Sequence, residues 1–198
     1  MNKKDNQFRY NEEDDRLLIE DILDFIKAFL VCSLIVIFLN AFVLSPKIVS
    51  GRSMHPTLQN RQRGIVNVLR ANISGIDRYD IVIAKVQDED KTTEVIKRVI
   101  ALPNDTISCQ DEVIYVNGKP LDEPYLNTEY REDWFRKNKY FTKNFHKIQL
   151  GPDEYFLLGD NRPLSQDSRD FGPIKRENII AKDFFVLWPF QDMHYITK

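Results

Sequence analysis

One long apolar block near the N-terminus dominates the pattern of hydrophobic and polar positions. Residues 28–44 read AFLVCSLIVIFLNAFVL, with no charged side chain and a single amide, Asn40. The apolar pattern continues beyond Lys27, whose long aliphatic stem can reach the edge of a bilayer. A bilayer core needs roughly 20 helical residues. The block therefore predicts one transmembrane helix over 25–45. The alternative is a buried core helix, which usually keeps a polar stripe.

The flanks of the apolar block favour an uncleaved signal anchor. The exit reads VLSPKIV, so Pro46 would directly follow a cut after Ser45, and no A-x-A pair is present. Basic residues near the block are almost balanced: Arg9, Arg16 and Lys27 precede it, and Lys47, Arg52, Arg61 and Arg63 follow it. This balance leaves the orientation of the helix open, because an excess of Lys and Arg on one side is what sets it.

Short apolar runs rich in β-branched residues fill the rest of the chain. They cover residues 64–69, 80–86, 94–102, 112–116 and 154–159. Runs of this length and composition predict strands, although some of them could form short helices instead. Asn117-Gly118 predicts a tight hairpin turn, followed by a short return strand through Pro120. No helical pattern of ten residues stands out, so the sequence predicts a mainly β fold.

Residues 121–150 differ from the predicted strands in character. This segment is charged and aromatic, and contains the stretch YLNTEYREDWFRKNKYFTKNFHKIQL. We interpret it as a variable insertion or subdomain within the β-rich part of the chain.

Composition and charge exclude several classes of protein. The chain has 198 residues, 28 Lys+Arg against 30 Asp+Glu, and a net charge of -2, which argues against nucleic acid as a partner. Two cysteines, Cys32 and Cys109, are too few for a disulfide scaffold or a cysteine zinc site. The three histidines are scattered along the chain, so nothing calls for a metal or an organic cofactor.

A candidate nucleophile follows the apolar block. In VSGRSMHPTL, Gly51 and Pro56 bracket Ser53, so a bend could present its hydroxyl, although most such serines are turn residues. A serine nucleophile needs a base. His55 is close in sequence, but it adjoins a stiff proline and needs an acidic partner placed by the fold. We expect His55 to be a solvated or packing residue.

Lys97 is the other candidate base. Strand alternation places Val95, Lys97 and Val99 on one face. A lysine among valines is placed to be desolvated, and burial can lower a lysine pKa from about 10.4 by about 3 units. From these residues alone, a lysine that snorkels to the sheet edge is the more ordinary interpretation.

A third stretch, LGDNRPLSQDSRDFGPI, is dense in charge and follows a predicted strand. Glycines at both ends and alternating charges predict an ordered loop held by paired charges, with a solvent-exposed turn as the alternative. The charged residues concerned are Asp160, Arg162, Asp167 and Arg169.

Four motifs occur in order after the apolar block: SGRSMHPTL, RYDIVIAK, IKRVIALPND and GDNRPLSQDSRDFG. Together they resemble the type I signal peptidases, closest to the short, single-span bacterial form. The resemblance runs from the anchor to about Gly172 and leaves out 121–150. It implies a signal-peptidase-like β catalytic core with an inserted subdomain, besides the N-terminal transmembrane helix.

The resemblance also implies roles for individual residues. The protein would be a membrane-bound serine endopeptidase that removes signal peptides from exported preproteins, with Ser53 as nucleophile and Lys97 as general base. Ser165 would orient the lysine amine, beside an ordered loop of Asp160, Arg162, Asp167 and Arg169. Two shallow apolar pockets for small substrate residues would be shaped by Met54, Leu58, Ile83 and Ile96. The Ser53 N–H would be one oxyanion donor; Gly51 stands where some relatives carry a hydroxyl, so the second donor stays open.

The implied organisation is a cytoplasmic tail over 1–24, a membrane anchor over 25–45 and an extracytoplasmic peptidase domain over 46–198. Three other functions stay open. A signal-peptidase-like accessory or chaperone for surface assembly would have lost the nucleophile or the base. A self-cleaving Ser-Lys repressor would need a DNA-binding module. The third alternative is a plain membrane-anchored binding domain. The sequence does not specify the preproteins or the oligomeric state.

Overall fold

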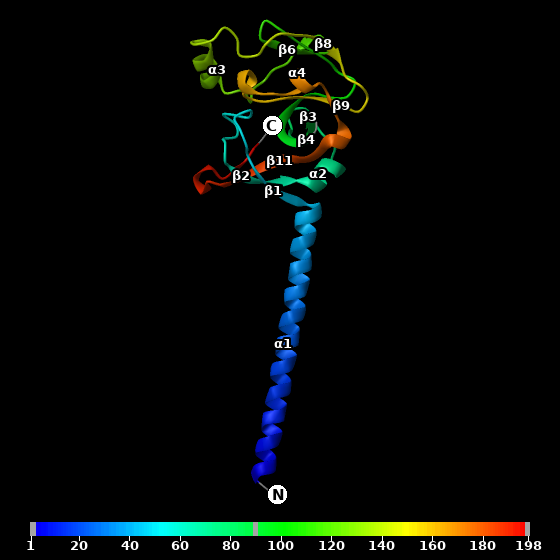
Figure 1. Ribbon diagram of the computed structural model, residues 1–198, viewed down its shortest axis with the longest axis vertical. Helices are drawn as coiled ribbons and strands as arrows, with labels where there is room; N and C mark the ends of the chain where they lie inside the picture. The colour runs from blue at the N-terminus through cyan, green and yellow to red at the C-terminus, as the bar shows by residue number, and fades with distance from the viewer. Residues whose placement is uncertain (1–2, 89–90, 197–198) are drawn as a thin grey trace. The chain divides into compact units, whose positions relative to one another are not determined.

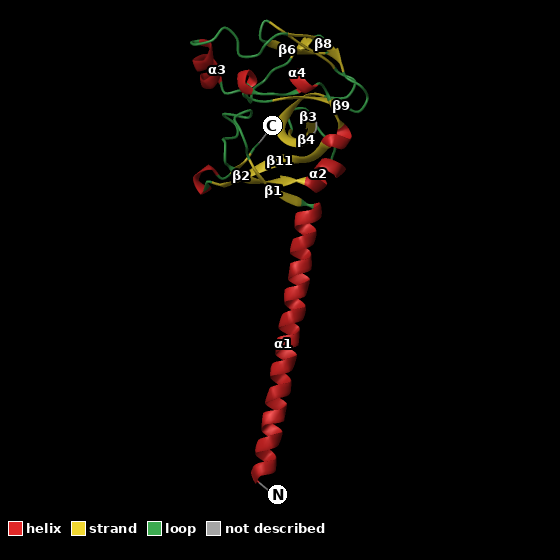
Figure 2. Ribbon diagram, in the orientation of Figure 1, coloured by secondary structure: helices red, strands yellow, loops and turns green. Residues whose placement is uncertain are grey.

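The structure, a computed structural model, describes residues 3–88 and 91–196, and the side chains of 17–39, 43–87 and 91–196. The chain divides into two compact units, Met1–Phe42 and Val43–Lys198. The first unit is a single helix, α1 (Lys3–Phe42), and the second is rich in strands (Figures 1 and 2).

Helix α1 contains the predicted membrane segment. Its most apolar part is Leu17–Leu39, 23 residues with a mean hydropathy of 2.6, and its side chains are not buried by other parts of the protein. This length is enough to cross a bilayer core. The helix ends three residues before the predicted end at Ser45, because Pro46 disfavours helical backbone in the residue before it.

The larger unit is built on two antiparallel sheets. The first has the strand order β1-β2-β11-β3-β4-β9-β10, with β12 also paired to β11. Its strands are β1 (Leu44–Ile48), β2 (Arg63–Asn67), β3 (Ile81–Asp88), β4 (Lys91–Ala101), β9 (Glu154–Leu158), β10 (Ile174–Lys175), β11 (Ile179–Trp188) and β12 (His194–Tyr195). The mainly β fold is thereby confirmed.

The second sheet has the order β7-β6-β5-β8. Its strands are β5 (Thr106–Gln110), β6 (Val113–Val116), β7 (Lys119–Pro120) and β8 (Phe145–Gln149). The hairpin predicted at Asn117-Gly118 joins β6 to β7, and both turn residues have the positive φ that a type I′ turn requires.

The predicted insertion over 121–150 is only partly separate from this sheet. It contains α3 (Thr128–Phe135), which begins where the Asn127 side chain accepts a hydrogen bond from the Tyr130 N–H. It ends in β8, which pairs with β5, so its C-terminal part belongs to the second sheet.

All five predicted strands are present, with shifted boundaries. The run over 64–69 shows the clearest difference, because Val68 already begins α2 (Val68–Ile73). The Asn67 side chain accepts from the Arg70 N–H and caps this helix, so β2 ends there. The remaining helices are α4 (Ser168–Phe171) and the 3-10 turns η1 (Arg162–Leu164), η2 (Arg176–Asn178) and η3 (Phe190–Asp192).

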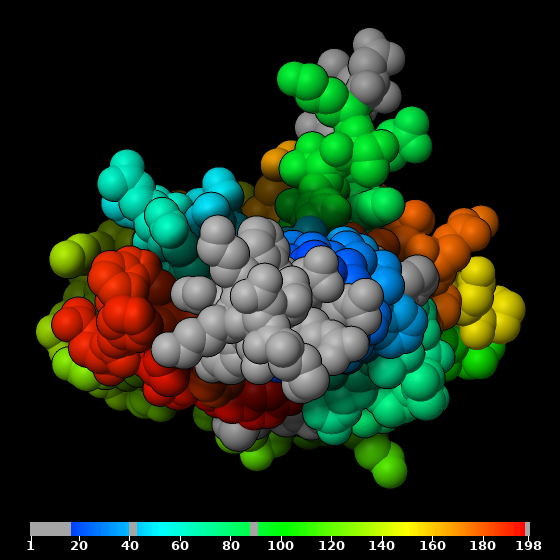
Figure 3. All heavy atoms as spheres, turned by 90° about the horizontal axis from the view of Figure 1, so that it is seen from below, coloured from blue at the N-terminus to red at the C-terminus, as the bar shows by residue number. Residues whose placement is uncertain are grey.

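Several large apolar side chains around η3 are exposed. Trp188 packs edge-on against Phe190 with ring centroids 4.8 Å apart, yet their exposed fractions are 49% and 70%. Met193 and Tyr195 of the following segment are also exposed. This C-terminal part of the chain is the red surface in Figure 3.

Candidate active site

Ser53 lies in a turn between β1 and β2. Gly51 adopts a φ of +89°, which glycine tolerates best, and its N–H donates to Asn60 Oδ1 at 3.0 Å. Beyond the turn, the Leu58 N–H donates to the Met54 carbonyl at 2.9 Å, and both side chains are buried in the core. Ser53 is therefore half-buried, on a bend that Met54 and Leu58 attach to the core. The flanking Gly51 and Pro56 predicted this bend.

Lys97 lies in β4, 44 residues further along the chain. It is paired with Val82 of β3, and its side chain is only 3% exposed. Its Nζ donates a hydrogen bond to Ser53 Oγ at 2.8 Å. The interpretation of Lys97 as a lysine that snorkels into solvent is thus wrong, because Ser53 meets its amine inside the protein.

Burial changes the acidity of this lysine. Desolvation lowers the pKa of Lys97 from 10.5 to about 8, although the negative charge of Asp167 opposes the shift. An amine with this pKa is neutral in a sizeable fraction of molecules near neutral pH. The lysine can therefore accept a proton, which an ordinary surface lysine rarely does.

Ser165 lies beside the Ser53 turn. A methyl group on Gly159 would overlap both the Ser53 carbonyl oxygen and Ser165 Oγ, so these two groups approach Gly159 from the same side. The Ser165 hydroxyl is buried, and no hydrogen-bond partner for it lies among the described residues. The expected hydrogen bond from Ser165 to the Lys97 amine is not formed in this structure.

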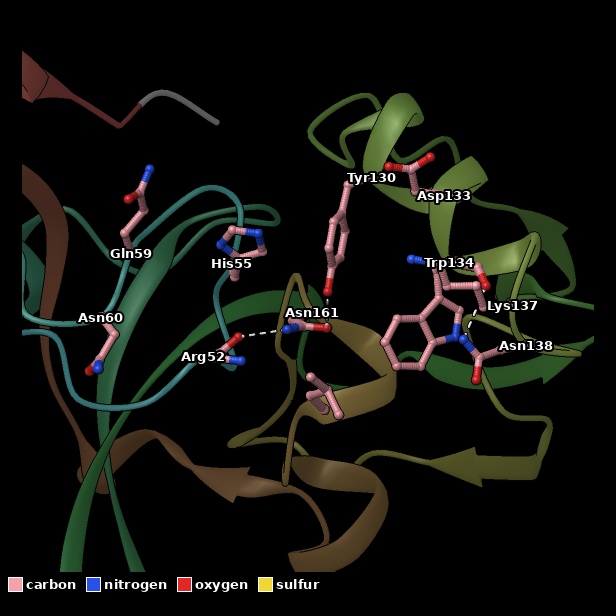
Figure 4. Close-up of a pocket in the computed structure, with 11 residues that line it drawn as sticks. Arg52, His55, Gln59, Asn60, Tyr130, Asp133, Trp134, Lys137, Asn138 and Asn161 are labelled. Atoms are coloured by element: carbon pink, nitrogen blue, oxygen red, sulfur yellow. Dashed lines mark hydrogen bonds between the residues drawn. The ribbon is translucent and has the colours of Figure 1, made fainter.

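Asn161 holds the Ser53 turn in place. Its N–H donates to the Ser53 carbonyl at 3.0 Å, and its Nδ2 donates to the Arg52 carbonyl at 2.9 Å. Its Oδ1 accepts from the Tyr130 hydroxyl at 3.1 Å, and Figure 4 shows Asn161 between Arg52 and Tyr130. His55 packs edge-on against Tyr130, with centroids 4.9 Å apart, which confirms it as a packing residue.

The charged loop after β9 is ordered by ion pairs, but two of them reach outside the loop. Asp160 receives two hydrogen bonds from Arg98, at 2.9 and 2.7 Å, and both side chains are 1% exposed. Thr57 of the Ser53 segment also donates to Asp160, at 2.6 Å. This carboxylate therefore connects the residue after Lys97 to the segment that carries Ser53.

The other loop charges join the insertion and the loop itself. Arg162 is fully buried and pairs with Glu123 of the insertion, and it also donates to the Gly159 carbonyl at 3.1 Å. Arg169 pairs with Asp167 at 2.7 Å and donates to the Arg162 carbonyl at 2.7 Å. The sequence predicted a loop held by paired charges of Asp160, Arg162, Asp167 and Arg169. In the structure, Arg98 and Glu123 from outside the loop supply the partners of Asp160 and Arg162.

The expected pocket residues lie in one apolar cluster. Met54, Leu58 and Ile83 are at most 2% exposed, and the half-buried Ile96 packs against the cluster. These side chains belong to the core beneath the surface, and the two pockets that they were expected to shape remain a prediction. Sequence reasoning passed over Gly159, Asn161, Arg98 and Thr57 as site residues, although all four lie within the quoted motifs.

The arrangement has the groups that nucleophilic catalysis by a serine requires. A serine hydroxyl contacts a buried amine of lowered pKa, which is the pairing of nucleophile and base that acyl transfer requires. Among the described side chains, those of residues 17–39, 43–87 and 91–196, no group of three or more His, Cys, Asp or Glu could hold a metal ion.

Comparisons with known proteins agree with this chemistry. The family model of signal peptidase, peptidase S26, matches residues 22–188. Signal peptidase I S of Bacillus subtilis (strain 168) is 35% identical over 178 residues, which cover 88% of this chain and 93% of the relative. Signal peptidase IB of Staphylococcus aureus (strain MRSA252) is 32% identical over 186 residues, 89% of this chain and 94% of the relative.

A crystal structure of a signal peptidase I from Enterococcus faecalis V583 also matches. It is 32% identical, and the match covers 55% of this chain and 96% of that chain with a TM-score of 0.48. The family model and the curated relatives span most of the chain, and on these grounds it belongs to the signal peptidase family, peptidase S26.

Proposed function

We propose that this protein is a membrane-bound serine endopeptidase that removes N-terminal signal peptides from exported preproteins, with Ser53 as nucleophile and Lys97 as general base. One observation carries the proposal: Lys97 Nζ lies 2.8 Å from Ser53 Oγ, and burial lowers the lysine pKa to about 8. The relatives named signal peptidase I supply the substrate class.

Acylation follows from this contact. Neutral Lys97 accepts the Ser53 proton as Oγ attacks the carbonyl carbon of the last signal-peptide residue. The protonated amine then gives this proton to the departing amine of the mature protein. The signal peptide is left as an ester on Ser53. A water that Lys97 deprotonates attacks this ester and releases the peptide acid and free Ser53.

The oxyanion of the tetrahedral intermediate needs hydrogen-bond donors. The Ser53 N–H is the first donor in the proposal. Gly51 N–H is an unsuitable second donor, because it already donates to Asn60 Oδ1. Ser50 is exposed and stands three residues before Ser53, and its hydroxyl is the remaining candidate in this turn.

Ser165 acts in the proposal as a positioning residue. Its buried hydroxyl has no other partner among the described residues, so it is available to accept a hydrogen bond from the Lys97 amine. When substrate binds, Lys97 would give up its hydrogen bond to Ser53 and form one to the substrate. The hydrogen bond between Lys97 and Ser165 would form at the same time. The ion pair between Asp167 and Arg169 keeps the backbone around Ser165 ordered, since Arg169 donates to the Ser165 carbonyl at 3.3 Å.

An extended substrate fits beside β4. Strand β4 pairs with β3 along Lys91–Arg98, whereas in the described part of the chain β9 covers its other edge only from Arg98 onward. A peptide can add to the open edge before Lys97 as a further strand. Ile96 then lies next to the residues before the cut, and the neighbouring apolar cluster admits small side chains there.

The membrane places enzyme and substrate together. Helix α1 is the anchor, and we place the unit from Val43 onward on the extracytoplasmic side, where exported preproteins emerge. The apolar core of a signal peptide occupies the same bilayer, so the cleavage site reaches the enzyme at the membrane surface.

The test is cleavage of a signal-peptide substrate with an Ala-x-Ala site, using the full chain in detergent. Wild-type enzyme should cut after the last Ala, as read from the masses of both products, and Ser53→Ala and Lys97→Ala should not. Lys119→Ala, which removes an exposed lysine from β7, is the matched control and should retain activity. Cleavage by the Ser53→Ala variant would contradict the role of Ser53 as nucleophile. No cleavage by folded wild type would contradict the proposal and favour a non-catalytic accessory.

A further inference from the structure

A second feature of the molecule adjoins Ser53 on the side away from the apolar cluster. A cavity of about 590 Å³ lies between the Ser53 turn and helix α3 of the insertion. Its volume falls within the range of about 300–1,000 Å³ that is usual for ligand pockets. Figure 4 shows His55 and Tyr130 facing each other at this cavity, with Trp134 and Lys137 beyond them on the α3 side.

The cavity adjoins the segment that carries Ser53. Arg52 lines it and directly precedes Ser53. Asn161 also lines it and donates to the Ser53 carbonyl through its N–H. A peptide chain that leaves Ser53 therefore meets these two residues first.

The position of β9 sends the substrate in this direction. Residues before the cut can follow the open edge of β4, but β9 occupies that edge from Arg98 onward. The substrate chain must leave the sheet edge after the scissile bond. Asn161 belongs to the loop that follows β9, so the cavity opens where the chain has to turn away.

The charges at the cavity favour an acidic ligand. Arg52 and Lys137 line it, and neither forms an ion pair within the described part of the protein. Asp133 is the carboxylate among the lining residues, and Arg136 already pairs with it at 2.9 Å. Arg52 and Lys137 can therefore attract an acidic group that enters the cavity.

We propose that this cavity binds the first residues of the mature protein, immediately after the cleavage site, and favours acidic side chains there. The inference rests on the proposed function, because it takes Ser53 as the point of cleavage. It gives the insertion over 121–150 a role, since α3 supplies one wall. Arg52 and Lys137 would distinguish acidic from basic substrate residues by charge, at positions partly exposed to solvent. The resulting preference should therefore be modest and should weaken with added salt.

The experiment compares three peptide substrates that are identical up to the Ala-x-Ala site. The second and third residues after the cut are Asp, Ala or Lys. Wild-type full-length enzyme in detergent should cleave the Asp peptide with a kcat/KM about two- to fivefold above that of the Lys peptide, with the Ala peptide between them. Added NaCl should narrow the difference, because it screens the charges.

Charge reversal at Lys137 provides the matched test. Lys137→Glu leaves one cation, Arg52, and introduces one anion at the cavity, so it should abolish the preference and make the kcat/KM values of the Asp and Lys peptides nearly equal. Lys139→Glu is the control, because it makes the same charge change two residues away at a different cavity. The control should keep the wild-type preference.

The outcomes separate this inference from the proposed function. Equal kcat/KM values for the three peptides with wild type, or the same shift from Lys139→Glu as from Lys137→Glu, would overturn the inference while the peptidase assignment stands. Failure of the folded enzyme to cleave any of the three would instead contradict the proposed function, and the inference with it.

Discussion

Gly159 packs so closely against the Ser53 carbonyl oxygen that no side chain fits between them. A Cβ at this position would come nearer to that oxygen, and to Ser165 Oγ, than real Cβ atoms come to any neighbour. The Gly159 N–H also donates to Asp167 Oδ2 at 3.0 Å, which fixes the glycine backbone. The loop after β9 and the Ser53 turn are therefore in direct contact at Gly159.

This contact predicts that Gly159→Ala disables the enzyme without unfolding it. The added methyl group has to displace the Ser53 turn, and a displacement of about 1 Å can lower the rate about a hundredfold. Cleavage assays should show this loss mainly in kcat. Gly151→Ala is the control, because its methyl group would meet a flexible Glu154 side chain at 3.2 Å. Equal activity of the two variants would contradict the account.

The Arg98–Asp160 pair predicts a large loss of stability when one partner is removed. Both side chains are 1% exposed, so Arg98→Met leaves a buried carboxylate without its partner and should cost about 3–5 kcal/mol of unfolding free energy. Chemical denaturation in detergent measures this cost. Arg136→Met should cost less than about 1 kcal/mol, because both side chains of its pair with Asp133 are exposed.

A double variant separates lost pairing from lost packing. Arg98→Met with Asp160→Leu should recover part of the stability, since no charge is then left buried. If the double variant is less stable than Arg98→Met alone, the buried charge is not the cause of the loss.

Sequence patterns predict strands from nearly continuous apolar runs and miss elements whose apolar run is interrupted or absent. The runs in β3, β4 and β9 are apolar and nearly continuous, and they were predicted as strands. Strand β11 was not, because Lys182 and Asp183 interrupt its apolar run. The register also shifts there, and Asp183 has a φ of +60°. Helix α3 has no buried residue, so its sequence shows no apolar stripe from which a helix could be predicted.

The site shows the same limit. Alternation correctly placed Lys97 beside valines, but alternation cannot show that a turn 44 residues earlier brings a hydroxyl to its amine. Motif resemblance pointed to the pair, and its roles as nucleophile and base remain a prediction. The roles of Asn161 and Glu123 depend on contacts between distant segments, and neither residue type nor local spacing indicates such contacts.

Because its amine is buried, we expect Lys97 to support activity and to lower the free energy of unfolding. Lys97→Met should lower kcat/KM by about a hundredfold to ten-thousandfold, because the general base is lost. The same variant should be more stable at neutral pH, since the shift of the Lys97 pKa from 10.5 to about 8 corresponds to roughly 3 kcal/mol against folding.

The pH dependence of this stability difference has a definite sign. Between pH 8 and 10.5 the unfolded wild-type chain binds more protons at Lys97 than the folded chain, so wild-type stability rises with pH. Thermal melting should show the largest advantage of Lys97→Met below pH 8 and a smaller one toward pH 10.5. A constant difference across this range would show that Lys97 is not desolvated.

The proposed orientation predicts which residues can be labelled from outside the cell. Lys119 is exposed in the hairpin between β6 and β7. Lys119→Cys should react with a membrane-impermeant maleimide on intact cells. Wild type serves as the control, because its Cys109 is 1% exposed and its Cys32 lies in the apolar part of α1. Labelling that occurs only after the membrane is permeabilised would contradict the proposed orientation and favour the opposite one.

The most direct test of a Ser53–Lys97 pair is the pH profile of kcat/KM for an Ala-x-Ala substrate. The lysine works as a base only when neutral, so activity should be low at pH 6 and rise with a single ionisation centred near pH 8. His55→Ala should leave the position of this rise unchanged. A rise centred near pH 6.5, where histidines usually titrate, that disappears in His55→Ala would contradict the account.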